Sequence, residues 1–305
     1  LTLDTAAAEQ AIGSVAATLG QSIQATALDI IRVANESMVQ AIQEITVREG
    51  TDPRDCTIVA GGGAAGLNMV EIVRELGVDS VLIPRTAGGL SATGAQFSDI
   101  VTEASRSDYQ HTRSFDFDRC AQVFASLDTE LAGFAAGLDV PGTAGQTITY
   151  SIDARYDQQV WEINVPLRGP VTDEASLLDL IEEFHRHHRR HFAVWDATAD
   201  VEVLSWRARL SLAMPKPPLE AAPVSQTRAA TATSFREAYF DGGPVKAGVF
   251  DSRYLRPGDQ INGPAVIEEP TTTVVLYPGS TAMVTALNNY LVTVDQADQS
   301  TGEAQ

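Results

Sequence analysis

The chain has 305 residues, of which 44% are hydrophobic and 20% charged, and its 21 Lys and Arg against 40 Asp and Glu give a net charge of -19. A chain this acidic is expected to have no nucleic acid partner and no anionic membrane partner, because both are bound mainly through Lys and Arg. The length predicts two or three domains, each with a hydrophobic core.

Three further features of the sequence limit the class of protein: its cysteines, its apolar runs and its first residue. Cys56 and Cys120 are too few for a disulfide framework, which favours a reducing cytoplasm. The sequence contains no run of about 18 or more apolar residues, so no membrane-spanning helix is predicted. The chain starts at Leu1 without an initiator Met, so we expect it to be part of a larger protein.

The first 50 residues predict two helices. Asp4 is a suitable N-cap for an Ala-rich helix, and Gly20 can end that helix in a left-handed conformation. Residues 26–48 then predict one long amphipathic helix, with Asn35 beside its apolar stripe. The stripe consists of Leu28, Ile31, Met38, Ile42 and Ile45.

A glycine-rich turn follows, between two strand-like segments. Residues 57–60 and 80–84 predict strands, and residues 67–77 predict a helix between them. With the turn at 61–66, this order of strand, turn, helix and strand predicts a βαβ unit with parallel strands. A second segment of small residues, 87–95, is expected to open a further helix.

The remainder of the chain alternates between helix-like and strand-like patterns. Residues 115–137 and 172–192 predict helices, whereas 147–166 and 200–212 alternate as strands do. Residues 238–291 predict short strands and turns.

These patterns predict three domains. A Pro-rich connector at 214–224 separates the last two. We expect an α/β region at 1–110, a mixed α+β region at 111–215 and a small β-rich region at 216–305. The expected fold class is therefore α/β plus β.

The glycine turn has three interpretations. Free backbone N–H groups and the positive end of the following helix can hold a phosphate or a ribose. Gly61, Gly63 and Gly66 match G-x-G-x-x-G, the dinucleotide fingerprint, but Asp79, 18 residues after Gly61, precedes the second strand instead of ending it. The other interpretations are a tight packing turn and a nucleotide-binding turn of another fold. A P-loop is excluded, because no Gly-Lys-Ser/Thr follows.

Four of the five histidines lie within seven residues, and two interpretations compete for them. On a helix, His187 or His188 could share a metal ion with His191. However, His188 and His191 continue an apolar stripe, and three neighbouring arginines raise the cost of a bound cation. Core or interface histidines are therefore favoured, with arginines that bind a carboxylate or an acidic partner. The cluster consists of His185, His187, His188 and His191 with Arg186, Arg189 and Arg190. No metal site is predicted.

Several blocks of sequence resemble one known family. They include 31–35 (Ile-Arg-Val-Ala-Asn), 52–55 (Asp-Pro-Arg-Asp), the glycine turn, 155–159 (Arg-Tyr-Asp-Gln-Gln) and 263–269 (Gly-Pro-Ala-Val-Ile-Glu-Glu). On these blocks the chain is similar, over essentially its whole length, to the C-terminal half of the hydantoinase A / oxoprolinase family. This family is related to subunits of ATP-dependent acetone and acetophenone carboxylases.

The resemblance implies a fold, cofactors and a site. The family resembles the acetate kinase, Hsp70 and actin superfamily, so the resemblance implies an RNase H-like second lobe that binds ATP with Mg²⁺. The phosphate-binding Asp-Gly-Gly-Thr turn of the family would lie in an N-terminal half that precedes this chain. The glycine turn would then be the adenosine motif, with nucleotide-binding residues Gly61, Gly62, Gly63, Ala64 and Asn68.

The resemblance also implies a reaction and partners. Family members use ATP to activate a carbonyl oxygen by phosphorylation, so a cyclic amide hydrolase subunit is expected. The alternatives are a subunit of an ATP-dependent ketone carboxylase and a non-catalytic scaffold. The expected partners are the N-terminal half with the phosphate-binding lobe, a B-type partner subunit and a small carbonyl substrate. No catalytic residue can be named from spacing.

One departure from the family pattern concerns the site. Asn68 stands where the family commonly has His, and Ala65-Gly66 replace Gly-Pro. An Asn side chain can hydrogen-bond, but it cannot carry a proton near neutral pH as His can.

Overall fold

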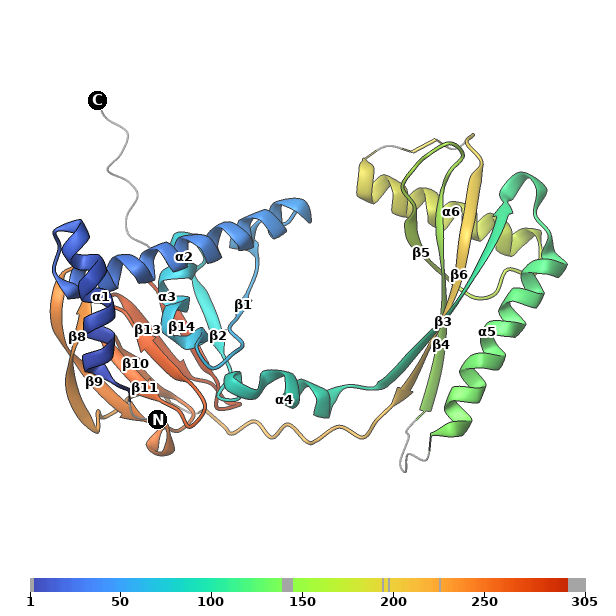
Figure 1. Cartoon of the computed structure of the whole chain (residues 1–305). Coiled ribbons are helices and arrows are strands. Elements are labelled where there is room, and N and C mark those ends of the chain that lie inside the picture. Colours follow the sequence, from blue (N-terminus) through green and yellow to red (C-terminus); the bar gives the residue numbers. More distant parts are fainter. Residues whose placement is uncertain (1–2, 139–144, 194, 197, 225, 296–305) are drawn as a thin grey trace. The chain divides into compact units, whose positions relative to one another are not determined.

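The computed structural model describes residues 3–138, 145–193, 195–196, 198–224 and 226–295. The chain forms two compact units (Figure 1). The first unit is discontinuous and combines Leu1–Ala95 with Pro218–Gln305, whereas the second unit is the continuous segment Gln96–Pro217. No described helix is long and apolar enough to cross a membrane.

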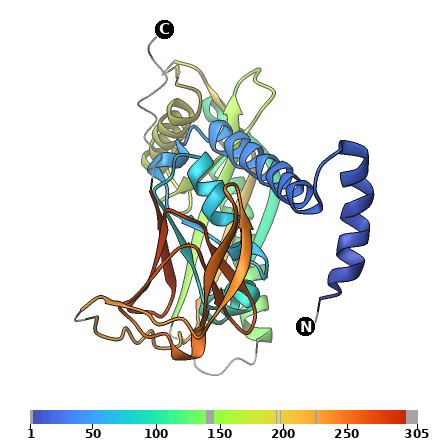
Figure 2. The same ribbon diagram turned by 90° about the vertical axis from the view of Figure 1, so that its left-hand side faces the viewer.

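The first unit begins with the two helices that the sequence predicts. Helix α1, Thr5–Leu19, is capped by the Asp4 side chain and ends at Gly20 with φ 68°. Helix α2, Ile23–Arg48, begins three residues earlier than expected, because the Ser22 side chain accepts a hydrogen bond from the Ala25 N–H. The two helices pack on each other (Figure 2).

The apolar stripe of α2 is largely exposed. Ile31 and Met38 each expose 40% of their surface and Ile45 exposes 61%, whereas the buried residues of the helix are Thr26, Asn35 and Val39. The side of α2 that packs against the rest of the first unit therefore includes a polar residue, Asn35, whereas we expected the apolar stripe to pack there.

The βαβ unit is confirmed. Strand β1, Ile58–Val59, and strand β2, Ser80–Ile83, are parallel with Ile58 opposite Val81, and helix α3, Ala65–Glu75, connects them. After β2, the 3-10 helix η2, Ala87–Gly89, leads into helix α4, Leu90–Phe97, which confirms the expected second helix.

The sheet of the first unit is mixed, because C-terminal strands join it. Strand β14, Tyr290–Val294, pairs with β2 in antiparallel orientation, and the order of the six strands is β1-β2-β14-β13-β10-β7. The added strands are β13, Ser280–Val284, β10, Asp259–Asn262, and β7, Arg228–Ala229.

A second sheet completes the first unit, in the order β12-β11-β9-β8. Its strands are β8, Ser234–Phe240, β9, Gly243–Asp251, β11, Ala265–Glu268, and β12, Thr273–Leu276. Residues of α3, β2 and these C-terminal strands share one hydrophobic core, so the two ends of the chain fold as one body. Two further 3-10 helices, η1, Pro53–Asp55, and η4, Ser252–Tyr254, lie in its loops.

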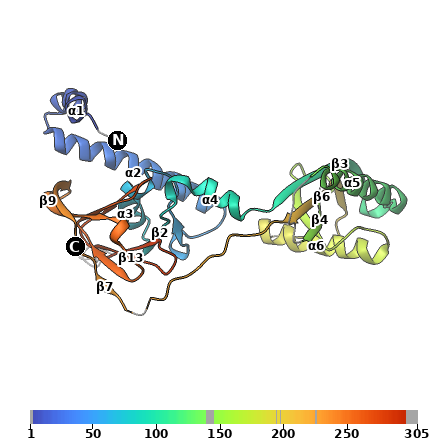
Figure 3. The same ribbon diagram turned by 90° about the horizontal axis from the view of Figure 1, so that it is seen from below.

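In its described residues, the second unit is an antiparallel sheet of four strands with two α-helices (Figure 3). Its strand order is β3-β6-β4-β5, and the helices share one hydrophobic core with the sheet. The elements are β3, Ile100–His111, η3, Thr112–Ser114, α5, Phe117–Gly137, β4, Gly145–Tyr156, β5, Ile163–Leu167, α6, Glu174–Phe192, and β6, Val201–Ala213.

The structure groups the chain differently from the three expected domains. The segment 218–305 shares a sheet and a core with residues 1–95 instead of forming a domain of its own, because β14 pairs with β2. The boundary expected at 110 lies inside β3, and this strand belongs wholly to the second unit.

Candidate functional site

The glycine turn connects the end of β1 to the start of α3. The Gly62 N–H donates to the Ala87 carbonyl at 2.7 Å, and the Ala65 N–H donates to the Gly62 carbonyl at 3.3 Å. Gly62 has φ 114°, a conformation that other residues rarely adopt. The first bond holds the turn against the segment that follows β2, and the second lies within the turn itself.

Two nearby glycines are required for packing. A Cβ on Gly66 would lie 2.4 Å from the Thr273 carbonyl oxygen, and a Cβ on Gly88 would lie 2.4 Å from the Thr271 carbonyl oxygen. Both distances are far below van der Waals contact, and both neighbours are backbone atoms. For Gly66, the interpretation as a tight packing turn is therefore correct, and the dinucleotide fingerprint is not needed to explain it.

The first four residues of the turn lie at the surface. Gly61, Gly62, Gly63 and Ala64 are exposed. Among the described residues, the backbone N–H groups of Gly63 and Ala64 have no hydrogen-bond partner. Because Ala64 is the N-cap of α3, these donors lie at the positive end of a helix of 11 residues.

A groove of about 830 Å³ runs along the turn, between α2 and α3. It is mainly apolar, and its lining contains all five residues that the sequence assigns to nucleotide binding. Their assignment to a nucleotide stays a prediction. The groove is lined by Met38, Ile42, Ile58, Val59, Ala60, Gly61, Gly62, Gly63, Ala64, Ala65, Leu67, Asn68, Met69 and Ile72.

Asn68 is tied to the long helix across this groove. Its Nδ2 donates to the Oδ1 of Asn35 at 2.8 Å, and Asn35 is 8% exposed. The sequence places Asn35 on α2 but gives no sign of this contact, because the two residues are 33 positions apart. Met38 and Ile42 are likewise groove residues that sequence reasoning assigned only to the apolar stripe of the helix.

Two family models match the chain. The hydantoinase/oxoprolinase model matches residues 1–104, and the hydantoinase/oxoprolinase C-terminal domain model matches residues 142–290. Together the two matches take in most of the sequence, including the glycine turn and the strands that pack beneath it. The chain belongs to the hydantoinase/oxoprolinase family.

Two relatives in this family have known activities. Caprolactamase subunit alpha of Pseudomonas jessenii is 32% identical over 289 residues, which take in 91% of this chain and 41% of that protein. 5-Oxoprolinase 1 of Arabidopsis thaliana is 26% identical over 286 residues, which take in 92% of this chain and 22% of that protein. The chain thus spans about two fifths or less of the length of these relatives.

Solved structures share the fold. The crystal structure of ATP-dependent caprolactamase from Pseudomonas jessenii matches with a TM-score of 0.76 and 27% identity, over 96% of this chain and 43% of that one. A nucleotide-free structure of acetone carboxylase, an enzyme of ATP-dependent acetone carboxylation, matches with a TM-score of 0.76 and 21% identity, over 97% and 43%. The mixed α/β fold with several sheets is therefore that of hydantoinase/oxoprolinase relatives.

A second cleft of about 830 Å³ lies at the C-terminal end of α2 in this hydantoinase/oxoprolinase chain. Its charged groups are Asp52, Arg54 and Glu75. The Asp52 carboxylate accepts hydrogen bonds from the side chain and backbone of Arg54, which lower its pKa to about 2. Asp52 and Arg54 form an ion pair with each other, so these two charges are less available to bind a ligand than the unpaired donors beside the glycine turn.

The histidine cluster lies on α6 in the second unit. His185 Nδ1 is 2.7 Å from the Tyr156 hydroxyl, and His188 is buried against the rings of Tyr156 and Phe184. Burial lowers the pKa of His185, which keeps its ring neutral. The Nε2 of His187 lies 3.9 Å from the Oε2 of Glu183, one turn earlier on the same helix.

Metal binding has no support in this part of the molecule. Within the ranges that the structure describes, no group of three or more His, Cys, Asp or Glu side chains could hold a metal ion. His185 and His188 have the contacts of core histidines, the interpretation that the sequence favoured.

Proposed function

We propose that this chain supplies the adenosine side of an ATP site in an ATP-dependent cyclic amide hydrolase. The observation that carries the proposal is the apolar groove beside the unpaired N–H groups of Gly63 and Ala64, in a chain of the hydantoinase/oxoprolinase family. An aromatic base fits an apolar groove, and helix N-terminal amides bind anionic or hydroxyl oxygens.

Different parts of the groove would bind different parts of the nucleotide. Met38 and Ile42 on α2 and Leu67 on α3 contribute apolar walls for the base. The Gly63 and Ala64 amides contribute donors for the ribose or the α-phosphate. The exposed backbone at Gly62 and Gly63 lets those oxygens approach closely, since no side chain stands in the way. The parallel pair β1–β2, connected by α3, is consistent with the second lobe of an RNase H-like fold.

A lactam is the substrate class that the relatives favour. Caprolactamase subunit alpha is more similar in sequence than 5-oxoprolinase 1, and both names denote enzymes that act on a cyclic amide. ATP would activate the amide oxygen by phosphorylation, and phosphoryl transfer depends mainly on positioning and on charge neutralisation. The residues that grip the transferred phosphate would come from the N-terminal half, and a B-type subunit would complete the enzyme.

Magnesium finds no ligands in this groove. None of the residues that line it is acidic, and Mg²⁺ in nucleotide sites is bound by carboxylates and phosphates. We therefore assign no Mg²⁺ ligand to the residues of this groove.

A bulky residue at an exposed position of the turn tests the proposal. Ala64→Trp would fill the groove without disturbing the core, because Ala64 is exposed. In the full-length protein with its partner subunit, we expect ATP affinity, measured by calorimetry, to fall at least about 10-fold, or about 1.4 kcal/mol.

The matched control is Ala121→Trp, at an exposed position of α5 in the second unit. It should leave ATP affinity unchanged. Equal affinity in the Ala64 and Ala121 variants would remove the groove from the nucleotide site. A protein that binds one ATP yet consumes it only with bicarbonate present would be a carboxylase, and one that binds none would be a scaffold.

A further inference from the structure

A turn made of threonines lies beneath the glycine turn. Residues 269–273 (Glu-Pro-Thr-Thr-Thr), here called the threonine turn, join β11 to β12, and the Glu269 N–H donates to the Thr272 carbonyl at 3.1 Å. The Thr272 hydroxyl donates to the Gly63 carbonyl at 2.9 Å, and Thr272 is 6% exposed. This side-chain bond therefore connects the C-terminal part of the chain to the proposed nucleotide site.

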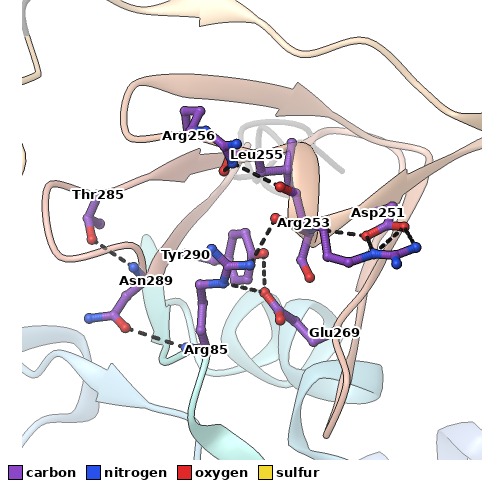
Figure 4. A network of polar contacts seen from close by, with 10 residues as sticks. Arg85, Asp251, Arg253, Leu255, Arg256, Glu269, Thr285, Asn289 and Tyr290 are labelled. Carbon is purple, nitrogen blue, oxygen red and sulfur yellow. Dashed lines mark hydrogen bonds and ion pairs between the residues drawn. The ribbon is translucent and has the colours of Figure 1, made fainter.

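The threonine turn is anchored by a buried carboxylate. The Glu269 side chain is 3% exposed, and its Oε1 accepts from Arg85 Nε at 2.7 Å and from the Tyr290 hydroxyl (Figure 4). Arg85 Nη2 also donates to the Ser252 carbonyl at 2.8 Å. Two separate parts of the chain thus hold Glu269, the segment that follows β2 and strand β14, and helix η4 in turn holds Arg85.

Burying the charged Glu269 side chain costs free energy. A buried carboxylate loses hydration, and here one arginine and one tyrosine compensate for that loss. Burial, reinforced by the hydrogen bond to Glu269, raises the pKa of Tyr290, so its hydroxyl stays protonated and remains a donor. A hairpin turn that served only to reverse the chain could be built from neutral residues without this cost.

Peptide geometry connects the threonine turn to nucleotide binding. In a trans peptide the carbonyl oxygen and the following N–H point in opposite directions across one plane. The Thr272 hydroxyl holds the Gly63 carbonyl towards the threonine turn, so the Ala64 N–H of the same peptide points away from it. Among the described residues, that N–H is one of the unpaired donors beside the groove.

We propose that Thr272, anchored through Glu269, is a positioning residue that orients the Ala64 N–H for the nucleotide. The inference rests on the proposed ATP site. It assigns a role in that site to residues that are about 200 positions away in sequence and do not line the groove. An amide fixed in advance binds more tightly, because less orientational freedom is lost on binding.

The test compares three substitutions in the full-length protein with its partner subunit. Thr272→Val removes the hydroxyl and keeps the shape, Thr272→Ser keeps the hydroxyl, and Thr273→Val is the matched control, since no hydrogen bond of the Thr273 hydroxyl exists among the described residues. The readouts are the ATP dissociation constant by calorimetry and the KM for ATP against kcat.

We expect Thr272→Val to raise the ATP dissociation constant and KM about 5- to 10-fold, the value of one hydrogen bond, with kcat at saturating ATP little changed. Thr272→Ser should restore binding to within about twofold of the unsubstituted protein, and Thr273→Val should match it. Tyr290→Phe, which removes one of the two donors to Glu269, should raise KM in the same direction by a smaller factor.

Three results would overturn the inference, and they can be told apart. If the unsubstituted protein binds no ATP, the proposed function fails and this inference fails with it. If it binds ATP and Thr272→Val binds equally well, the inference alone is wrong and the groove remains. A fall in kcat without a change in KM would also contradict it, because a looser binding amide affects affinity first.

Discussion

The sheet of the second unit and the glycine turn of the first unit differ in how their polar groups are paired. In the second unit, Asp153 accepts hydrogen bonds from Arg207, Asn164 and Ser205 on one face of the sheet, and Glu202 accepts from Arg155 and Tyr109. In the first unit, the glycine turn leaves backbone donors unpaired beside an apolar groove.

This difference distinguishes polar groups that stabilise the fold from polar groups that can bind a ligand. Asp153 and Glu202 already have partners, so they contribute to the stability of the second unit and are not free to bind a ligand. The donors of the glycine turn have no partner among the described residues, so a ligand can supply one.

The largest expected effect concerns Gly66. Gly66→Ala would bring Cβ within 2.4 Å of the Thr273 carbonyl oxygen in a buried position, so backbone must move. We expect the free energy of unfolding of the first unit to fall by about 3 kcal/mol, measured by urea denaturation. Gly89→Ala is the control, because nothing lies within 4 Å of its Cβ and its cost should stay below about 1 kcal/mol. Equal stability of the two variants would show that the threonine turn does not press on the glycine turn.

A smaller effect is expected for Glu202 in the second unit. Burial would raise the pKa of Glu202, but hydrogen bonds from Arg155 and Tyr109 outweigh it and leave the pKa below its ordinary value. Glu202→Gln should therefore lower the free energy of unfolding by about 1–2 kcal/mol at pH 7.

The pH dependence of that difference follows from its sign. A carboxyl whose pKa is lower in the folded state stabilises above its unfolded pKa, and this contribution is lost as the pH falls through the folded pKa. The gap between the unsubstituted protein and Glu202→Gln should therefore shrink from about pH 5 downward. Glu182→Gln, at an exposed position of α6, should show no such gap. A gap that persists at acidic pH would mean that the charge of Glu202 is not what stabilises the unit.

The smallest effect is expected at the basic end of α6. Arg189 is exposed and has no side-chain ion pair within the described segments, so Arg189→Gln removes only a favourable charge near a helix C-terminus. We expect the free energy of unfolding to change by no more than about 0.5 kcal/mol in thermal or urea denaturation. A loss above about 1 kcal/mol would reveal a contact and would extend the pairing pattern of the second unit to this helix.

Local patterns predicted much of the first unit. The Asp4 cap, the Gly20 end, the strands around the glycine turn and the helix after it all follow from residues within a few positions of one another. Burial of α2 was harder to predict, because Asn35 turns inward to bond Asn68 while Ile45 stays exposed. That choice depends on α3, which the stripe itself does not encode.

Non-local pairing explains what the sequence could not reveal. Nothing near β2 predicts that Tyr290 and its strand lie beside it, or that Thr272 contacts Gly63. The candidate site was therefore predicted as a glycine turn, from its composition and the family resemblance, while its supports were missed. The histidines show the same limit, since His185 and His188 find their partners on Tyr156 and Gln159, almost 30 positions earlier.

The pairing of β14 with β2 also sets an order of assembly. During synthesis the second unit leaves the ribosome as one uninterrupted stretch, so its core can form while the rest of the chain is still being made. The first unit must wait for Tyr290–Val294, which closes its sheet across more than 200 residues of intervening chain. Until then, the apolar face of β2 stays open, and a chain stopped short of β14 would be a substrate for chaperones and proteases.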